Sequence, residues 1–185
     1  MEKGLGEYRN LLDKVSSKFD EVMQRNPQHF SCGSGCHSCC VPGLSVFRIE
    51  FENIVNALNT QPELAERVRR LIGGKNFSSD RCAMLDPQGR CSIYEVRPLI
   101  CRSHGAPIFS KMAGEFETTP VLDVCPLNFS KLEKLNSLSP NDFINIDILN
   151  QLLVLLNKQY ETEIEKGRRR SLSPEALVAA MKSKN

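Results

Sequence analysis

The sequence predicts a mainly helical α+β protein, in which a small cysteine-rich β-hairpin core is packed by three to five helices. Apolar residues recur at helical spacing in three segments, 5–25, 46–59 and 142–166. Between the last two, residues 82–94 change to short apolar runs around a turn, which is typical of a hairpin. With 185 residues, of which 41% are hydrophobic, the chain has enough apolar material for a single domain over 1–185.

The first predicted helix, 5–25, ends before Asn26-Pro27, because proline disfavours helix in the residue that precedes it. Its apolar stripe comprises Leu5, Tyr8, Leu11, Leu12, Val15, Phe19, Val22 and Met23. The second helix, 46–59, carries Phe47, Phe51, Ile54, Val55 and Leu58. A short third helix is expected from Thr60, as N-cap, to Ile72, where two glycines stop it.

The hairpin is expected from two short runs, Cys82-Ala-Met-Leu and Cys91-Ser-Ile-Tyr, which flank the turn sequence Asp86-Pro87-Gln88-Gly89. Each arm would carry one cysteine. Four prolines make residues 97–130 irregular, apart from a second weak hairpin around 108–118. The helix over 142–166 would be the longest, and Ser173-Pro174 would cap another, so that C-terminal helices cover 142–182.

Composition excludes some classes of function. A net charge of +2 provides no large field to attract nucleic acid or membrane lipid, so we expect neither as a partner. The first residues contain no apolar signal-peptide core, and the strongest apolar stretch, Leu152 to Leu156, is too short to cross a bilayer. We therefore expect a cytoplasmic protein. The sequence identifies no protein partner.

Eight cysteines provide the main functional signal. Four crowd into nine positions and four follow singly: Cys32, Cys36, Cys39, Cys40, Cys82, Cys91, Cys101 and Cys125. Such cysteines are bridged, ligate a metal, or do thiol chemistry, and a reducing cytosol favours metal binding. Four thiolates bind zinc tetrahedrally or hold an iron–sulfur cluster. Whether such a centre is structural or catalytic, and so whether the chain is an enzyme, stays open.

The crowded cysteines would share one face if residues 32–40 were partly helical, and Cys36–Cys40 could form a first helical turn. Adjacent side chains diverge, so Cys39 and Cys40 could serve two nearby metal positions. We expect Cys36, Cys39 and Cys40 to converge with at least two of the four later cysteines, because ligands from distant segments let a metal close a loop.

Other polar residues near the cysteines are weaker candidates. His37 and His104 could ligate zinc or iron, although the favoured interpretation of each is a surface histidine or one that supports a ligand. His29 is a weaker candidate still. Arg97 and Arg102 flank Cys101 and would either favour a nearby thiolate–metal centre or form structural ion pairs.

The order of these residues resembles the YkgJ-type cysteine-cluster family, nicknamed CxxCxxCC and described as zinc- or iron-chelating. The matching phrases are Cys32-x3-Cys36-x2-Cys39-Cys40, Cys82-x-x-Leu85-Asp86, Cys91-Ser-Ile-Tyr-Glu-Val-Arg97-Pro98-x-x-Cys101-Arg102, and Cys125. They span roughly 30–127, and the first gap has three residues where the nickname has two. The resemblance implies that the matching cysteines chelate a metal, zinc or iron.

The resemblance also leaves room for an enzyme. The alternative function is a metal- or thiol-dependent enzyme or redox protein, which would have an open coordination site or a thiolate that reacts. A similar cysteine cluster occurs in a flagellin lysine N-methylase, and this resemblance adds a link to protein methylation to the alternative. No segment of the chain resembles a glycine-rich nucleotide loop for S-adenosylmethionine, so this link is one of analogy.

Overall fold

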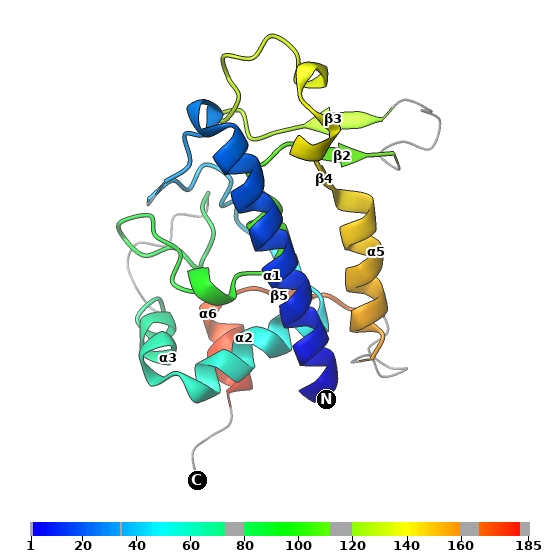
Figure 1. Cartoon of the computed structure of the whole chain (residues 1–185). Helices are drawn as coiled ribbons and strands as arrows, with labels where there is room; N and C mark the ends of the chain where they lie inside the picture. The colour runs from blue at the N-terminus through cyan, green and yellow to red at the C-terminus, as the bar shows by residue number, and fades with distance from the viewer. Residues whose placement is uncertain (1, 34, 73–79, 112–119, 160–166, 182–185) are drawn as a thin grey trace. The chain divides into compact units, whose positions relative to one another are not determined.

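The computed structural model describes residues 2–33, 35–72, 80–111, 120–159 and 167–181 (Figure 1). The chain forms two compact units, each described separately below. Unit 1 comprises Gly33–Pro98 and Asn157–Asn185, and unit 2 comprises Glu2–Cys32 and Leu99–Leu156. In the described residues, helices predominate over sheets of two and three short strands, which confirms the predicted mainly helical α+β class. The expectation of a single domain over 1–185 stays a prediction.

Unit 1 is built on three helices that pack together, α2, α3 and α6 (Figure 1). Its elements are β1 (Ser45–Val46), α2 (Arg48–Thr60), α3 (Pro62–Arg69), the 3₁₀ turn η2 (Tyr94–Val96), β5 (Arg170–Ser171) and α6 (Pro174–Ala180). The two short strands pair antiparallel, Ser45 opposite Ser171. The apolar core of the unit includes Met84 and Ile93, both 1% exposed, so the cysteine-bearing loop is anchored in it.

The helices of unit 1 begin where local chemistry satisfies their free N–H groups. The Glu50 carboxylate accepts a hydrogen bond from the Phe47 backbone N–H at 2.9 Å, at the start of α2. Pro62 is the first residue of α3, where the N–H that proline lacks would have no partner within the helix. Ser173 caps α6 by accepting from the Ala176 N–H at 3.2 Å, as predicted.

Unit 2 joins a long helix to a small sheet. Its elements are α1 (Glu2–Arg25), η1 (Pro27–His29), α4 (Leu99–Ser103), β2 (Ile108–Ser110), β3 (Val121–Asp123), η3 (Leu135–Ser137), η4 (Pro140–Asp142), β4 (Ile144–Asn145) and α5 (Ile146–Asn157), whose last residue belongs to unit 1. The strand order is β3-β2-β4, with β3 antiparallel and β4 parallel to β2. Helix α1 packs against α4.

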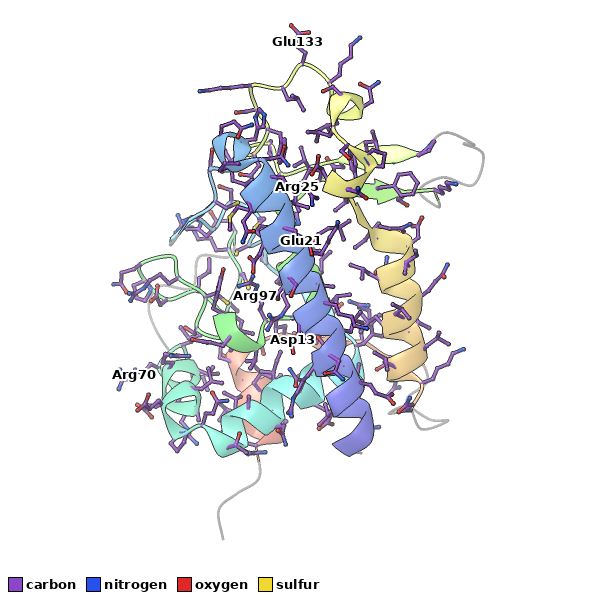
Figure 2. All side chains as sticks on the ribbon, in the orientation of Figure 1. Asp13, Glu21, Arg25, Arg70, Arg97 and Glu133 are labelled. Carbon is purple, nitrogen blue, oxygen red and sulfur yellow. The ribbon has the colours of Figure 1, made fainter. Side chains whose placement is uncertain are left out.

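The C-terminal end of α1 is fastened by Asp142, whose carboxylate is largely buried. Arg25, labelled with Glu21 in Figure 2, donates from Nε to Asp142 Oδ1 at 2.8 Å. Asn26 Nδ2 donates to the same oxygen at 3.1 Å and to the Val22 carbonyl at 3.0 Å. The turn before β4 is therefore tied to the end of α1, more than a hundred residues away in sequence.

The structure corrects the boundaries of the helix predicted over 142–166. Helix α5 starts at Ile146 and ends at Asn157, and α1 is longer. Ser139-Pro140 instead starts a 3₁₀ turn, in which Ser139 Oγ accepts from the Asn141 N–H. Residues 144–145 then pair with β2, and strand pairing prevents helix there. Residues 160–166 lie outside the described part of the chain.

The remaining predictions differ mainly in detail. The helices expected over 5–25 and 46–59 are present as α1 and α2, and the third ends at Arg69. The second weak hairpin pairs β2 with β3, whose connection at 112–119 lies outside the described residues. A segment predicted to be irregular, 97–130, contains the five-residue helix α4, which is too short to leave a periodic apolar pattern.

We predict that Leu177→Ala destabilises the protein by about 2–5 kcal/mol, because this side chain is fully buried where α6 meets α2 and α3. Leu155→Ala, at a side chain that is 58% exposed, should change the free energy of unfolding by less than about 0.5 kcal/mol. Urea unfolding followed by circular dichroism measures both. Equal effects of the two substitutions would contradict the packing described for α6.

Candidate metal centre

The two units divide the eight cysteines between them. Five belong to unit 1, namely Cys36, Cys39, Cys40, Cys82 and Cys91, and three belong to unit 2, namely Cys32, Cys101 and Cys125. All eight lie in the described part of the chain and are free thiols. Cys125 is buried, Cys32 and Cys39 are exposed, and the others are partly buried. Each unit therefore presents its own set of sulfur atoms.

In unit 1, the crowded cysteines lie on a turn and not on a helix, so a first helical turn at Cys36–Cys40 was a wrong expectation. The Cys40 N–H donates to the His37 carbonyl at 2.9 Å, which closes a four-residue turn. Gly35 precedes it with a φ of 85°, a left-handed conformation that interrupts any helix starting earlier. The turn exposes Cys39 and keeps Cys40 half-buried.

A second segment of unit 1 brings Cys82 and Cys91 to this turn. The Cys82 backbone N–H donates to the Cys40 carbonyl at 2.9 Å. Leu85 and Cys91 form one antiparallel bridge, and the Ser92 N–H donates to the Met84 carbonyl at 2.8 Å. The predicted hairpin is thus a tight loop with one bridge, and it places a cysteine near each end.

The tip of this loop is organised by Asp86. Its carboxylate accepts from the backbone N–H of Gln88 at 2.9 Å and of Arg90 at 2.8 Å, and from Arg90 Nε at 2.9 Å. Partial burial would raise the pKa of this carboxyl, but the hydrogen bonds and the charge of Arg90 outweigh it and hold the pKa below its usual range. The loop therefore keeps its shape at neutral pH.

His37 packs against this loop at Gly89. A Cβ on Gly89 would lie 2.5 Å from His37 Cδ2, so the imidazole occupies the space that any other residue would fill. Gly89 also has a φ of 76°, which favours glycine. His37 therefore joins the cysteine turn to the hairpin loop by packing, and its role as a ligand stays a prediction.

The cysteines of unit 1 influence one another electrostatically. The pKa of Cys40 is raised above its ordinary value by a hydrogen bond with Cys39, by burial, and by repulsion from Cys39, Cys82 and Cys91. Burial raises the pKa of Cys82, and that of Cys91 to about 11. At Cys91, a hydrogen bond from the Ile93 backbone and the charge of Arg97, labelled in Figure 2, lower the pKa and partly oppose the effect of burial. Four thiols thus lie close enough for their charges to repel.

In unit 2, the three cysteines come from separate elements. Cys101 lies on α4, Cys125 begins a turn in which the Asn128 N–H donates to its carbonyl at 2.8 Å, and Cys32 ends the segment that follows η1. Asn128 Nδ2 lies 3.1 Å from Cys32 Sγ. The sequence does not indicate a role for Asn128, because a single asparagine after Cys125-Pro-Leu matches no known motif.

The other candidates in unit 2 have visible structural roles. Arg102 donates from Nη1 to Ser16 Oγ at 2.9 Å and so links α4 to α1. His29 stacks on Phe129, with ring centroids 5.1 Å apart. His104 is exposed after the end of α4, where its N–H donates to the Ile100 carbonyl at 3.1 Å. Their roles at a metal stay predictions.

No group of three or more His, Cys, Asp or Glu side chains in the described residues is arranged as a ready-made metal cage. The donors nevertheless suit zinc or iron, because thiolates are the soft ligands these metals accept. Cys39, Cys82 and Cys91 are the predicted ligands whose charges raise the pKa of Cys40, so the backbone places these four thiols near one another in spite of their repulsion. The predicted convergence of Cys36 with them stays a prediction.

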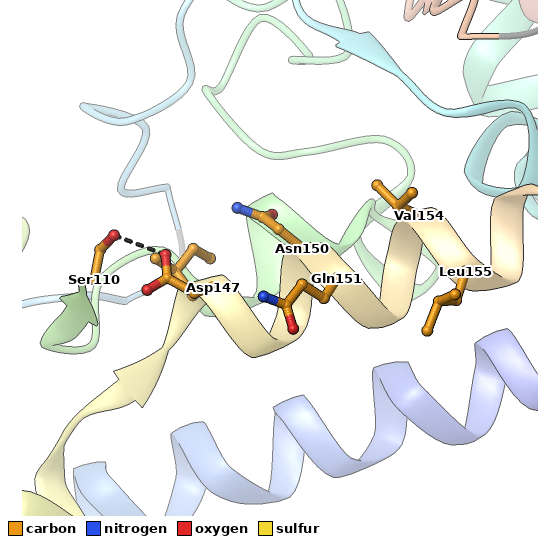
Figure 3. A pocket seen from close by; sticks show the side chains of 7 residues that line it. Ser110, Asp147, Asn150, Gln151, Val154 and Leu155 are labelled. Carbon is orange, nitrogen blue, oxygen red and sulfur yellow. Dashed lines mark hydrogen bonds between the residues drawn. The ribbon is translucent and has the colours of Figure 1, made fainter. Parts of the chain in front are cut away.

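A groove in unit 2 of about 600 Å³ is separate from this chemistry (Figure 3). It runs along α5 and is lined by Ser110, Ile146, Asp147, Asn150, Gln151, Val154 and Leu155. Ser110 Oγ donates to the Asp147 carboxylate at 2.7 Å, which joins the end of β2 to the start of α5. None of the lining residues is a cysteine or histidine, so the groove is not the candidate centre.

We predict that Gly105→Ala in unit 2 destabilises the protein by at least about 1 kcal/mol. Gly105 has a φ of 107°, and its added Cβ would lie 3.3 Å from both Cys32 Sγ and Asn128 Nδ2. Gly6→Ala is the matched control, because Gly6 lies in α1 with nothing near its missing Cβ, so alanine should be neutral or stabilising. Urea unfolding measures both, and a neutral Gly105→Ala would contradict the close approach.

We also predict that the metal-free protein loses stability above about pH 9. The pKa of Cys91 is raised from its ordinary value of 9.0 to about 11, so its contribution is complete below pH 9 and is lost as pH rises through 11. The loss should be at most about 3 kcal/mol. Unfolding of chelator-treated protein across this range measures it, and Cys91→Ser should lose less. Identical profiles would contradict burial of the thiol.

Comparisons with known proteins agree with this cysteine chemistry. No helix among the described residues is long and apolar enough to span a membrane. Neither the search of curated proteins nor the search of solved structures found a match. A family model, CxxCxxCC, described as "Putative zinc- or iron-chelating domain", matches residues 31–126, which hold all eight cysteines. The chain therefore belongs to the CxxCxxCC family.

Proposed function

We propose that this protein is a cytoplasmic metal-binding protein that holds zinc or iron, including iron in an iron–sulfur cluster, through its clustered cysteines. The observation that supports this most is in unit 1, where the Cys82 N–H donates to the Cys40 carbonyl at 2.9 Å. There the pKa of Cys40 is raised by a hydrogen bond with Cys39, by burial, and by the charges of Cys39, Cys82 and Cys91. Four thiols gathered in one place repel as thiolates, and a bound cation removes that repulsion. The family's description supports the same chemistry.

The proposed ligands are the eight cysteines, taken in two sets. Cys39, Cys40, Cys82 and Cys91 form the set in unit 1, with Cys36 beside them on the same turn. The second set, in unit 2, comprises Cys32, Cys101 and Cys125. Since no cage is ready-made in the described residues, ligation requires rotation of thiol side chains. Cys39 is exposed and Cys40 half-buried, so rotation of their side chains costs little free energy.

The metal's proposed role is mainly structural. A bound zinc or iron centre supplies a cross-link between the cysteine turn and the hairpin loop, which are joined in the protein by backbone contacts such as that of Cys82 with Cys40. Met84 and Ile93 already anchor the hairpin loop in the core of unit 1. The turn at Cys36–Cys40 has no comparable buried anchor, so it depends most on the metal.

We predict that Cys39→Ser lowers the metal content and loosens the turn at Cys36–Cys40, while the buried Met84 and Ile93 positions stay ordered. A structural zinc site contributes on the order of 10 kcal/mol, so the melting temperature should fall as well. Cys91→Ser should act in the same direction. Metal analysis and hydrogen exchange measure the two effects, with helix α5 of unit 2 as the unaffected reference.

Ser38→Ala is the matched control, because Ser38 adjoins Cys39 on the same exposed turn and provides no thiol. It should keep both metal content and melting temperature. Should Cys39→Ser keep them too, Cys39 is no ligand, and thiol chemistry becomes the better explanation of the cluster. An absorption spectrum of protein purified without oxygen identifies the metal: broad visible absorption indicates iron–sulfur, and a colourless protein with stoichiometric metal indicates zinc.

A further inference from the structure

Asn128 makes hydrogen bonds with segments of unit 2 that are far apart in the sequence. Its Oδ1 accepts from the Ser31 backbone N–H at 2.9 Å. Its Nδ2 donates to the Gly105 carbonyl at 2.7 Å and to Cys32 Sγ at 3.1 Å. The residue is 1% exposed, so water does not compete for these groups. Asn128 lies two residues beyond the end of the family match.

These partners fix the orientation of the carboxamide. Oδ1 must face the Ser31 N–H, because Nδ2 has no lone pair to accept from it. Nδ2 must face the Gly105 carbonyl for the corresponding reason. The second hydrogen on Nδ2 is then left for Cys32 Sγ, while a thiol hydrogen on Cys32 has Oδ1 at 3.5 Å as its acceptor. Asn128 therefore supplies an N–H donor that is aimed at this sulfur.

Gly105 makes the close approach of these groups feasible. A Cβ at this position would lie 3.3 Å from Cys32 Sγ, 3.3 Å from Asn128 Nδ2 and 3.4 Å from the Phe19 ring. The absence of a side chain leaves the space that the sulfur and the carboxamide occupy. Gly105 follows α4, which carries Cys101, so the same contact ties the Cys32 segment to the end of that helix.

The turn that carries Cys125 is braced against the same segment. The Asn128 N–H donates to the Cys125 carbonyl, and Phe129 has a φ of 55°, which is uncommon for a bulky residue. Phe129 is held there by its N–H, which donates to the His29 carbonyl at 2.7 Å, and by edge-on packing with Phe30, 5.3 Å between ring centroids. These contacts hold the turn after Cys125 against residues 29–30, which precede Cys32 in the chain.

We propose that Asn128 is a positioning residue for the metal centre, which holds the sulfur of Cys32 in place and donates an N–H to it when the metal binds. Cys32 is exposed, and it lies outside any helix or strand, so its own backbone does not fix the sulfur. Donors to ligating atoms orient the ligand, and losing one typically weakens metal binding about 10- to 100-fold. The metal role rests on the proposed function, but the contact itself does not.

The contact is tested first in metal-free protein. In a ¹⁵N NMR spectrum, the two side-chain amide protons of Asn128 should both exchange slowly, and their signals are identified by their absence from Asn128→Asp. Cys32→Ala should speed exchange of one proton and leave the other, which faces Gly105, protected. An unchanged pair of signals in Cys32→Ala would overturn the proposal, because this variant removes only the sulfur that Asn128 Nδ2 contacts.

The metal role is tested by cobalt titration, which reads thiolate ligation through sulfur-to-metal charge-transfer absorption. Asn128→Asp keeps the acceptor for Ser31 and loses both donors, and we expect binding about 10- to 100-fold weaker at the site that includes Cys32. Cys32→Ala should weaken the same site, and the double variant should be no weaker than Cys32→Ala alone. A purely structural role of Asn128 would instead add to the effect of Cys32→Ala.

Asn26→Ala is the control for loss of a buried asparagine. Asn26 is 9% exposed, and its amide bonds Val22 and Asp142 in unit 2 without touching a cysteine. It should leave cobalt affinity unchanged, and equal weakening in this control would overturn the metal role of Asn128. A wild-type protein that binds no cobalt, zinc or iron would overturn the proposed function and that role together, whereas the NMR result decides the contact separately.

Discussion

Repulsion among neighbouring thiolates is the constraint on which the candidate centre depends. Cys39, Cys82 and Cys91 lie near enough to Cys40 that a negative charge on any of them makes the ionised form of Cys40 less favourable. Without a cation, the neutral form of these thiols is therefore favoured, and the partly buried ones, Cys40, Cys82 and Cys91, pack as small apolar side chains. A metal ion reverses this preference, since it binds thiolates and releases their protons. The same four thiols can therefore pack as neutral side chains without a metal and bind a metal as thiolates.

The scaffold of unit 1 separates anchoring from ligation within the same short segment. On one arm Met84 is fully buried in the helical core, two residues after Cys82, and on the other Ile93 is buried two residues after Cys91. Both cysteines pack at the margin of this core and not inside it. Burial of Met84 and Ile93 therefore holds the loop in place. The sulfur atoms of Cys82 and Cys91 are left at the border between core and solvent, where a metal ion can reach them.

The sequence predicted well whatever depends on periodicity or on residue type. The stripes of α1 and α2 gave their positions to within a few residues, and the cysteine order identified the family. It failed where tertiary contacts decide. The start of α5 is set by strand pairing of Ile144 with β2, and no local pattern reports a partner in another segment.

The role of Asn128 could not be predicted for a similar reason. A single asparagine contributes nothing to an apolar repeat. Its role comes from its hydrogen-bond partners, the N–H of Ser31, the carbonyl of Gly105 and the sulfur of Cys32. The sequence also does not indicate the close approach at Gly105, because a glycine near prolines predicts only a turn. The need for glycine there arises from the close approach of Cys32 and Asn128, which only the folded chain reveals.

The family match covers the cysteines, but both units depend on residues outside it. In unit 1, Leu172 and Leu177 complete the core in which the hairpin loop is anchored, and they come from the C-terminal segment. In unit 2, α1 precedes the match and packs against α4, the helix that carries Cys101. A fragment of residues 31–126 would keep all eight cysteines and lose the packing that positions them. The flanking segments therefore supply the packing that places the cysteines, which are the proposed ligands, and the motif alone does not.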